Sequence, residues 1–492
     1  MHAGEESDNG IVPMKHPNND RQRFAEEAEG SPVTKENTVE PNTDRTQSRA
    51  TVSSGLDRVR QAARRNKQGR FTALLHHLTV DLLRQSFHAL QREAAPGVDG
   101  VRWREYETGL EDRLSDLYSR IHRGAYRAQP SRRVYIPKSD GRQRPLGIAA
   151  LEDKIVQQAV ATLLNQIYEQ DFKGFSYGFR PGRSQHHALD ALTVGLTRKK
   201  VNWVLDADIR GFFDNIDHEW LVKFLQHRIA DSRVLRLIQK WLKAGVSEQG
   251  QWSGTKVGTP QGAVISPLLA NVYLHYVLDL WAEAWRKKCA RGDVIFIRYA
   301  DDFVMGFEQR ADAERFQREL RERLGKFGLE LNQDKTRLIE FGRFANSNRK
   351  KRGEGKPETF DFLGFTHICG KNPVTGYFEV RRKTVAKRLA GKLREIKQQL
   401  RRRMHDRVAD TGEWLGSVVR GYFQYHAIPG NRGRLHSFRS GVIRHWRHAL
   451  QRRSQKAKPR WRKVAALVRR YIPTVRAVHP FPSVRFDAMH PR

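Results

Sequence analysis

The chain has 492 residues, 38% of them hydrophobic, so it is long and apolar enough for two or three folded domains and is not a disordered tail. Its formal net charge of +36 indicates a polyanionic partner. The only cysteines, Cys289 and Cys369, form no Cys-x-x-Cys pair, which argues against a disulfide framework or a zinc module. The sequence also lacks the long apolar span or signal-like segment that would indicate a membrane protein.

Residues 1–55 are polar and are expected to form a mobile leader. Apolar residues then recur at helical spacing between residues 56 and 90, and Leu74, Leu78 and Leu82 belong to the resulting stripe. Further helices are expected at 107–121, 153–168 and 188–197, and a β-hairpin from strands 132–136 and 144–148, which turns at 139–141. The glycine-rich segment 174–184 predicts a loop that exposes Arg180 and Arg183.

Three acids follow apolar strands in the middle of the chain. A strand that starts at Val204 delivers Asp208 just before a glycine, and strands 294–298 and 303–307 predict a hairpin with Asp301 and Asp302 in its turn. Unpaired buried carboxylates cost several kcal/mol, so this arrangement indicates a cation; a solvated Asp-rich turn is the alternative. We expect Asp208 and Asp301 to face each other and to hold divalent cations of the kind used in phosphoryl transfer. Asp206 shares the strand face of Asp208 and competes for the role.

Helices at 219–244, 264–285 and 311–327, with strands at 329–331 and 337–341, complete an α+β pattern. Residues 342–358 are a linker, either a disordered insertion or a loop that touches nucleic acid. A strand at 360–365 and a hairpin near 372–373 precede helices at 385–405, 412–426 and 437–456.

Residues 381–492 hold 30 Lys and Arg against 5 Asp and Glu, a net +25, whereas residues 1–50 carry −4. Aromatic residues are interleaved with this positive charge: Trp414, Tyr422, Phe423, Tyr425, Trp446, Trp461 and Tyr471. Stacking partners together with phosphate partners indicate RNA. An anionic membrane or mere solubility are the alternative explanations, and we expect a soluble, cytoplasmic protein.

Several blocks, in this order, resemble the group II intron reverse transcriptases with their maturase region. They lie at 95–100, 135–138, 144–148, 177–184, 204–214, 258–262, 266–271, 299–302, 331–336, 360–365 and 414–426. The C-terminal residues resemble the bacterial, endonuclease-lacking, group IIC-like members. The resemblance implies an α+β right-hand polymerase with an antiparallel palm sheet. Its parts would be an N-terminal extension with fingers (56–200), a palm (201–375), a helical thumb or maturase domain (376–456) and a basic tail (457–492).

The resemblance also implies residue roles. Asp208, Asp301 and Asp302 would be catalytic and, together with Ile209, would hold two Mg²⁺ ions. Lys138, Arg144, Phe213, Gln261 and Lys335 would contact the nucleotide, and Arg180, Arg183, Arg420 and Gln424 would contact RNA. From the residues alone, the alternatives are a simple buried aromatic for Phe213, an ion pair for Lys335, and a solvated surface position for Lys138 or Arg144.

The implied function is that of an RNA-directed DNA polymerase that binds group II intron RNA, assists its splicing and copies it at a DNA target from a primer and dNTPs. It would act as a cytoplasmic, nucleoid-associated ribonucleoprotein. Two alternatives stay open: a splicing cofactor without polymerase activity, and a repurposed host or defence-associated reverse transcriptase.

Overall fold

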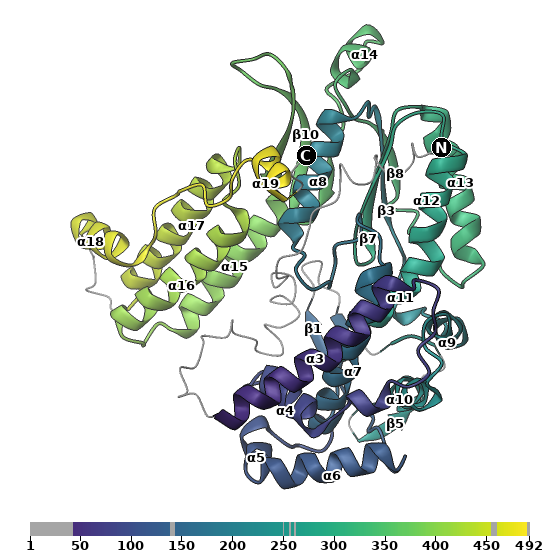
Figure 1. Ribbon diagram of the computed structural model, residues 1–492. Helices are drawn as coiled ribbons and strands as arrows, with labels where there is room; N and C mark the ends of the chain where they lie inside the picture. The colour runs from purple at the N-terminus through teal and green to yellow at the C-terminus, as the bar shows by residue number, and fades with distance from the viewer. Residues whose placement is uncertain are drawn as a thin grey trace.

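The computed structural model describes residues 43–137, 143–248, 250–254, 257–259, 262–453 and 460–489. It contains three sheets, with strand orders β2-β1-β4-β5, β6-β7-β3-β8 and β11-β10-β9, and these sheets are surrounded by helices (Figure 1). The expected α+β class is therefore confirmed. Within the described ranges, no helix is both long and apolar enough to cross a membrane.

The N-terminal part is helical and packs around one long buried helix. Its elements are α3 (Thr43–Arg65), η1 (Leu75–His77), α4 (Val80–Ala89), α5 (Trp103–Glu107), α6 (Leu110–His122) and the central α7 (Leu151–Asp171). Leu74, Leu78 and Leu82 are buried, as predicted. They do not lie on one helix, because Leu74 and Leu78 flank the short 3-10 turn η1 and only Leu82 belongs to α4. The predicted end of the leader at residue 55 is too late, because α3 already begins at Thr43. The first 42 residues lie outside the described ranges.

The fingers sheet contains the predicted hairpin and a second one. Strands β1 (Ser131–Pro137) and β2 (Gln143–Ile148) pair antiparallel, with Ile136 opposite Arg144. The expected turn at 139–141 lies outside the described residues. The short strands β4 (Val246–Glu248) and β5 (Gln251–Ser253) extend this sheet and were not expected from the sequence.

The palm sheet has two apolar faces covered by different elements. Its strands are β3 (Trp203–Asp208), β6 (Val294–Tyr299), β7 (Asp302–Phe307) and β8 (Arg337–Glu340), and β3 pairs antiparallel with both β7 and β8. Leu205, Phe296 and Met305 face the core that contains α11 (Ser266–Leu274), η3 (His275–Asp279), α12 (Leu280–Lys288) and α13 (Arg310–Gly325). Val204 and Val304 point to the other face, which α8 (Gln185–Arg198) covers (Figure 1).

The region between β3 and β6 is mainly helical. It contains η2 (Phe212–Asp214), α9 (His218–Gln226) and α10 (Ser232–Lys243) before the fingers strands β4 and β5. The expected long apolar helix at 264–285 exists, but it is interrupted, because η3 is a π-helix between α11 and α12. A π-helical turn inside an α-helix is often found at a functional site.

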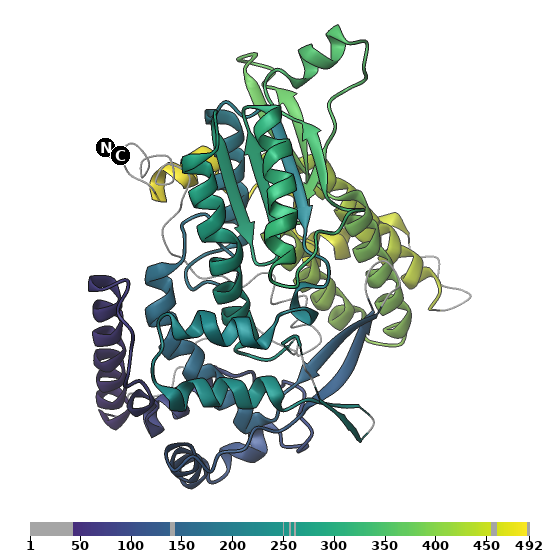
Figure 2. The same ribbon diagram turned by 90° about the vertical axis from the view of Figure 1, so that its right-hand side faces the viewer.

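The predicted linker at 342–358 contains a short helix, α14 (Ala345–Lys351), which projects from the palm (Figure 2). Asn348 donates from Nδ2 to Glu340 Oε1 over 3.1 Å, and Arg352 Nη2 lies 2.5 Å from Glu340 Oε2. Because Glu340 is buried on β8, these contacts tie the segment to the palm sheet. The expectation of a disordered insertion was wrong. The third sheet follows with β9 (Phe360–Phe362), β10 (Phe365–Lys371) and β11 (Phe378–Thr384).

The thumb is a bundle of α15 (Ala386–Arg402), α16 (Val408–His426) and α17 (Arg432–Gln451), as predicted. Its own core contains Ile396, Leu415 and Trp446. The predicted basic tail is not a simple tail, because it forms α18 (Trp461–Tyr471) and α19 (Pro482–Met489). Val464 of α18 belongs to the thumb core.

Helix α19 returns to the palm and packs on α8 (Figure 1). Phe486 is buried in the core that α8 shares with the palm sheet. Asp190 of α8 accepts from Arg382 Nη1 over 3.1 Å and from Arg485 Nε over 2.5 Å. Both Asp190 and Arg382 are buried, and Asp190 therefore joins β11 and α19 to the palm.

Asp190→Ala should destabilise the protein, because it leaves the buried Arg382 guanidinium without its carboxylate. Removing one partner of a buried pair costs about 3–5 kcal/mol. Thermal unfolding and limited proteolysis should show a lower midpoint and earlier cleavage near α19. The matched control is Asp487→Ala, which breaks the largely exposed pair with Arg198 at 2.6 Å and should cost about 0–1 kcal/mol. Equal effects of the two substitutions would contradict this role of Asp190.

Candidate active site

The predicted acidic hairpin is confirmed. Tyr299 pairs with Asp302, so that Ala300 and Asp301 form a two-residue loop between β6 and β7. Ala300 has φ 56°, one of three non-glycine residues with positive φ among the described residues. Such loops need positive φ and usually have glycine there, whereas an alanine in this conformation is strained. The turn that presents the acids therefore needs support from its surroundings.

Asp208 lies directly opposite Asp302 across β3 and β7. The sequence had suggested Asp301 as the facing residue, and the register instead places Asp301 in the adjacent loop. Directly opposed residues point to the same face with Cβ atoms about 4.5–5.5 Å apart, and like charges there repel each other. This pair of carboxylates therefore needs a positive neighbour.

Lys335 supplies positive charge at this position. Its Nζ lies 2.9 Å from Asp208 Oδ2, and Asn332 Nδ2 donates to the same oxygen over 3.1 Å. The Lys335 side chain is 56% exposed, so it can move away from Asp208 at little cost. The ion pair considered from the sequence is thus present, and its partner is the acid expected to bind metal.

Asp206 shares the strand face of Asp208, as period-2 geometry required. Its Oδ2 lies 3.6 Å from Arg337 Nη2, and Arg337 is its partner across β3 and β8. Burial raises the pKa of Asp206 to about 7, and the Arg337 charge opposes that rise. Asp206 lies opposite Val304, whereas Asp208 lies opposite Asp302 and beside the Asp301 loop. Asp208 is therefore the better candidate metal ligand.

The donor set at the end of the palm sheet suits a hard divalent cation, because it consists of carboxylates and main-chain oxygen. Within the described ranges, no three His, Cys, Asp or Glu side chains already converge as metal ligands. Asp208 O accepts from Asn332 N at 2.8 Å, and Arg210 N donates to Glu330 O at 2.9 Å. Since successive peptide groups of a strand point to opposite edges, the carbonyl of Ile209 points towards the β7 side.

The expected nucleotide contacts are placed only in part. Phe213 lies in η2 and is half-buried, whereas its neighbour Phe212 is the fully buried ring, with centroids 5.3 Å apart. Phe213 O accepts from Thr259 N at 2.9 Å, which joins η2 to the loop before Gln261. Arg144 is exposed on β2. Lys138 and Gln261 lie outside the described residues.

Arg180 and Arg183 are not exposed, and this prediction was wrong. Arg180 is 2% exposed and bonds Glu169 through Nε at 3.0 Å and Nη2 at 3.1 Å. Its Nη1 also donates to Lys173 O and Ser176 O, and Arg183 donates to Gly174 O and Ser176 O. Both guanidinium groups thus hold the 174–184 loop in shape, and the structure gives them no surface from which to reach RNA.

The thumb residues fit the expectation better. Arg420 and Gln424 are exposed on α16. Most of the interleaved aromatics, however, do not lie open: Trp446 and Phe423 are buried in the thumb core, and Tyr422 stacks on Phe438. Trp461 is exposed beside Arg447, whose guanidinium carbon lies 5.4 Å from the ring centroid.

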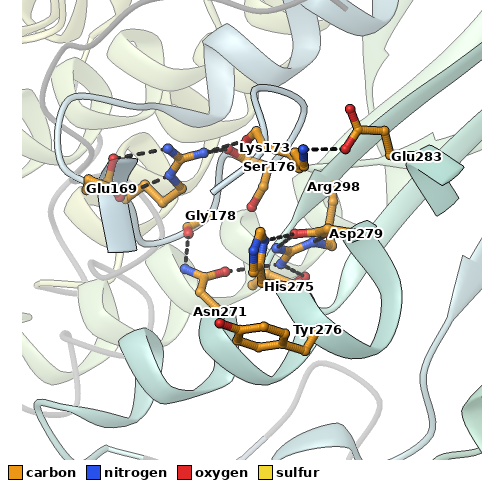
Figure 3. A network of polar contacts seen from close by, with 12 residues as sticks. Glu169, Lys173, Ser176, Gly178, Asn271, His275, Tyr276, Asp279, Glu283 and Arg298 are labelled. Carbon is orange, nitrogen blue, oxygen red and sulfur yellow. Dashed lines mark hydrogen bonds and ion pairs between the residues drawn. The ribbon is translucent and has the colours of Figure 1, made fainter. Parts of the chain in front are cut away.

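The sequence interpretation missed a buried polar network behind the acidic turn (Figure 3). Arg298 of β6 and Asp279 of η3 are both 0% exposed and form a two-point ion pair. The signal was available, since Arg298 is a charged residue at the end of an apolar strand and Asp279 interrupts an apolar helix. Charged residues in apolar segments are almost never fully buried unless they are paired, so each of these two residues indicates a buried partner.

Comparison with known proteins identifies the family. Residues 136–367 match the model of the reverse transcriptase (RNA-dependent DNA polymerase) family. The chain is 39% identical to "Protein YkfC" of Escherichia coli K12 over 275 residues, which are 49% of this chain and 72% of that protein. It is 37% identical to "Group II intron-encoded protein LtrA" of Lactococcus lactis subsp. cremoris over 231 residues, 46% of this chain and 38% of that protein.

A third similar protein is the "Uncharacterized 91 kDa protein in cob intron" of Schizosaccharomyces pombe, 43% identical over 146 residues, 30% of this chain and 18% of that protein. The chain belongs to the reverse transcriptase family and, within it, to the group II intron reverse transcriptases and maturases.

Arg180→Ala should lower stability without weakening RNA binding. The substitution leaves the buried Glu169 carboxylate without its guanidinium partner, and losing one partner of a buried ion pair costs about 3–5 kcal/mol of stability. Thermal unfolding measures the loss of stability. Filter binding of intron RNA, at a temperature at which the variant is still folded, measures the affinity for RNA. Arg420→Ala is the control and should show the reverse pattern, with unchanged stability and weaker binding. Weaker RNA binding by a fully folded Arg180→Ala protein would contradict the structural role.

Proposed function

We propose that this protein is an RNA-directed DNA polymerase that binds group II intron RNA, assists its splicing and reverse-transcribes it during intron mobility. The supporting observation is the register that sets Asp208 opposite Asp302 beside the strained Asp301 turn. Two opposed carboxylates need positive charge, and the exposed Lys335 supplies some of it through its ion pair with Asp208. Divalent cations would meet this need more fully.

Asp208, Asp301, Asp302 and the Ile209 carbonyl would hold two Mg²⁺ ions at the end of the palm sheet. When bound, such ions activate an attacking hydroxyl and stabilise charge on a leaving pyrophosphate. In the overall reaction, the primer 3′-hydroxyl releases its proton to solvent, its oxygen bonds to the α-phosphorus of a dNTP, and the bond from that phosphorus to the leaving pyrophosphate breaks. Lys335 would leave Asp208 and donate a proton to the pyrophosphate, a role suited to a mobile ammonium group.

The remaining residues would position the substrates. Phe213 would exclude a ribose 2′-hydroxyl and so favour dNTPs, and Gln261 would line the same pocket. The hydrogen bond from Thr259 N to Phe213 O supports this placement, because it holds the loop before Gln261 against η2. Lys138 and Arg144, from the fingers hairpin, would contact the triphosphate, because its negative charge needs cations.

RNA would be held by the basic C-terminal part, with Arg420 and Gln424 on the exposed side of α16. Residues 381–492 carry a net charge of +25, and phosphate contacts supply most of the sequence-independent affinity for nucleic acid. Splicing chemistry would remain with the intron RNA, and the protein would stabilise its folded form in the cytoplasm. DNA target and primer would reach the same palm.

Asp301→Ala and Asp208→Asn should each abolish primer extension on an RNA template with Mg²⁺ while leaving RNA binding intact. Metal-assisted charge stabilisation is worth several kcal/mol, which corresponds to a rate loss of at least about 100-fold. Asp334→Asn, an exposed acid beside Lys335, is the matched control and should extend like the wild type. A splicing assay on the same proteins should show near-normal activity. Wild-type extension by Asp301→Ala would refute the site.

A further inference from the structure

Arg298 connects the acidic turn to the helical layer behind the palm sheet. Its Nε and Nη2 donate to Asp279 Oδ1 at 2.7 Å and Oδ2 at 2.6 Å. Its Nη1 donates to Ala300 O at 2.9 Å and to Asn271 Oδ1 at 3.1 Å. Neighbouring residues of a strand point to opposite faces, so Arg298 lies on the face of Phe296 and not on that of Asp208 and Asp302. It therefore acts on the turn from behind.

The same network holds the turn through a second segment. Asn271 Nδ2 donates to Gly178 O at 2.7 Å, and a Cβ on Gly178 would overlap the backbone nitrogen of Ala300. The main chain of 175–177 also runs beside the end of β6, since Arg298 N donates to Phe175 O at 2.9 Å and Tyr177 N donates to Arg298 O at 2.8 Å. Asn271 thus links this close contact to the guanidinium of Arg298.

Asp279 is held in place by the local break in the long helix. It is the last residue of the π-helical turn η3, between α11 and α12. Its neighbour His275 is buried, and its Nδ1 lies 4.0 Å from Asp279 Oδ2. Burial and the positive charge of Arg298 lower the pKa of His275 to about 3, so the ring is neutral and does not compete with Arg298 for Asp279.

We propose that Arg298, Asp279 and Asn271 form a positioning clamp that fixes the strained Ala300–Asp301 turn and so aims the Asp301 and Asp302 carboxylates at the cation site. These are positioning residues, because they lie on the face of the sheet opposite to Asp208 and Asp302. The proposal rests on the polymerase function proposed above. Figure 3 shows the clamp, with Asn271 between Gly178 and the Arg298–Asp279 pair.

A clamp and a merely stabilising pair predict different results for an apolar replacement. Exchanging a buried ion pair for apolar residues of similar volume is often neutral for stability. The apolar pair can fill the space but cannot hold the Ala300 carbonyl. If the network only stabilises the fold, the double variant should regain both stability and activity, whereas loss of a clamp should leave a stable protein with a misplaced turn.

The test compares wild type with Arg298→Met/Asp279→Leu in primer extension on poly(rA) primed with oligo(dT). The clamp predicts that kcat falls by roughly tenfold to 100-fold, as for a small misplacement of reacting groups. The Mg²⁺ concentration for half-maximal rate should rise, while KM for dTTP, RNA binding and the unfolding midpoint stay near wild type. Arg382→Met/Asp190→Leu, which replaces the buried pair between β11 and α8, should retain the wild-type kcat.

Arg298→Lys provides the second variant, because an ammonium group keeps the charge beside Asp279 but lacks the planar fork needed for four bonds. It should fold and show the same rise in Mg²⁺ requirement. Hydrogen exchange of a peptide covering residues 296–304 should be faster in both variants, a readout that does not need polymerase activity. The clamp would be overturned if both variants kept the wild-type kcat, the wild-type Mg²⁺ dependence and the wild-type rate of hydrogen exchange. A wild-type protein that cannot extend primers would instead refute the proposed function, and hydrogen exchange would still decide on the clamp.

Discussion

Like charges meet where β3 ends and β7 begins, and the rest of the palm is arranged around that constraint. Asp208 and Asp302 face each other across two strands, and such a pair is unfavourable unless positive charge lies between or beside the carboxylates. Lys335 relieves part of the repulsion through its contact with Asp208. The strained turn at Ala300 adds a second cost, and the helical layer behind the sheet holds that turn through Arg298.

The two faces of the palm sheet therefore carry different groups: the acids of the candidate site lie on one face, and the residues that hold their turn lie on the other. The acids lie on the face shared with Val204 and Val304, whereas Arg298, Asp279 and Asn271 lie among the helices on the other face. Charge on the first face is accessible to a cation and to substrate, and charge on the second is fully paired and sealed from water. A buried pair costs desolvation energy, and its retention here is explained by the geometry of the turn that it holds.

Local pattern predicted much of this structure, because strands, helices and the acidic hairpin follow from periodicity and turn chemistry. The thumb helices and the hairpin at Asp301 are examples. Long-range partners could not be predicted in the same way. Arg180 was expected in an exposed glycine-rich loop, and only the fold brings Glu169 to its guanidinium. The docking of α19 on α8 likewise depends on Asp190, which lies 295 positions before Arg485. The π-helical turn that ends at Asp279 contains no glycine or proline that would have marked it.

The most direct test of the central claim is anomalous diffraction from crystals of the protein with Mn²⁺, an RNA template, a DNA primer and a dNTP. We predict Mn²⁺ peaks within coordinating distance of Asp208, Asp301 and Asp302, with the Lys335 ammonium displaced from Asp208. Mn²⁺ bound only at other residues, with the Lys335 contact to Asp208 intact in the assembled complex, would contradict the account.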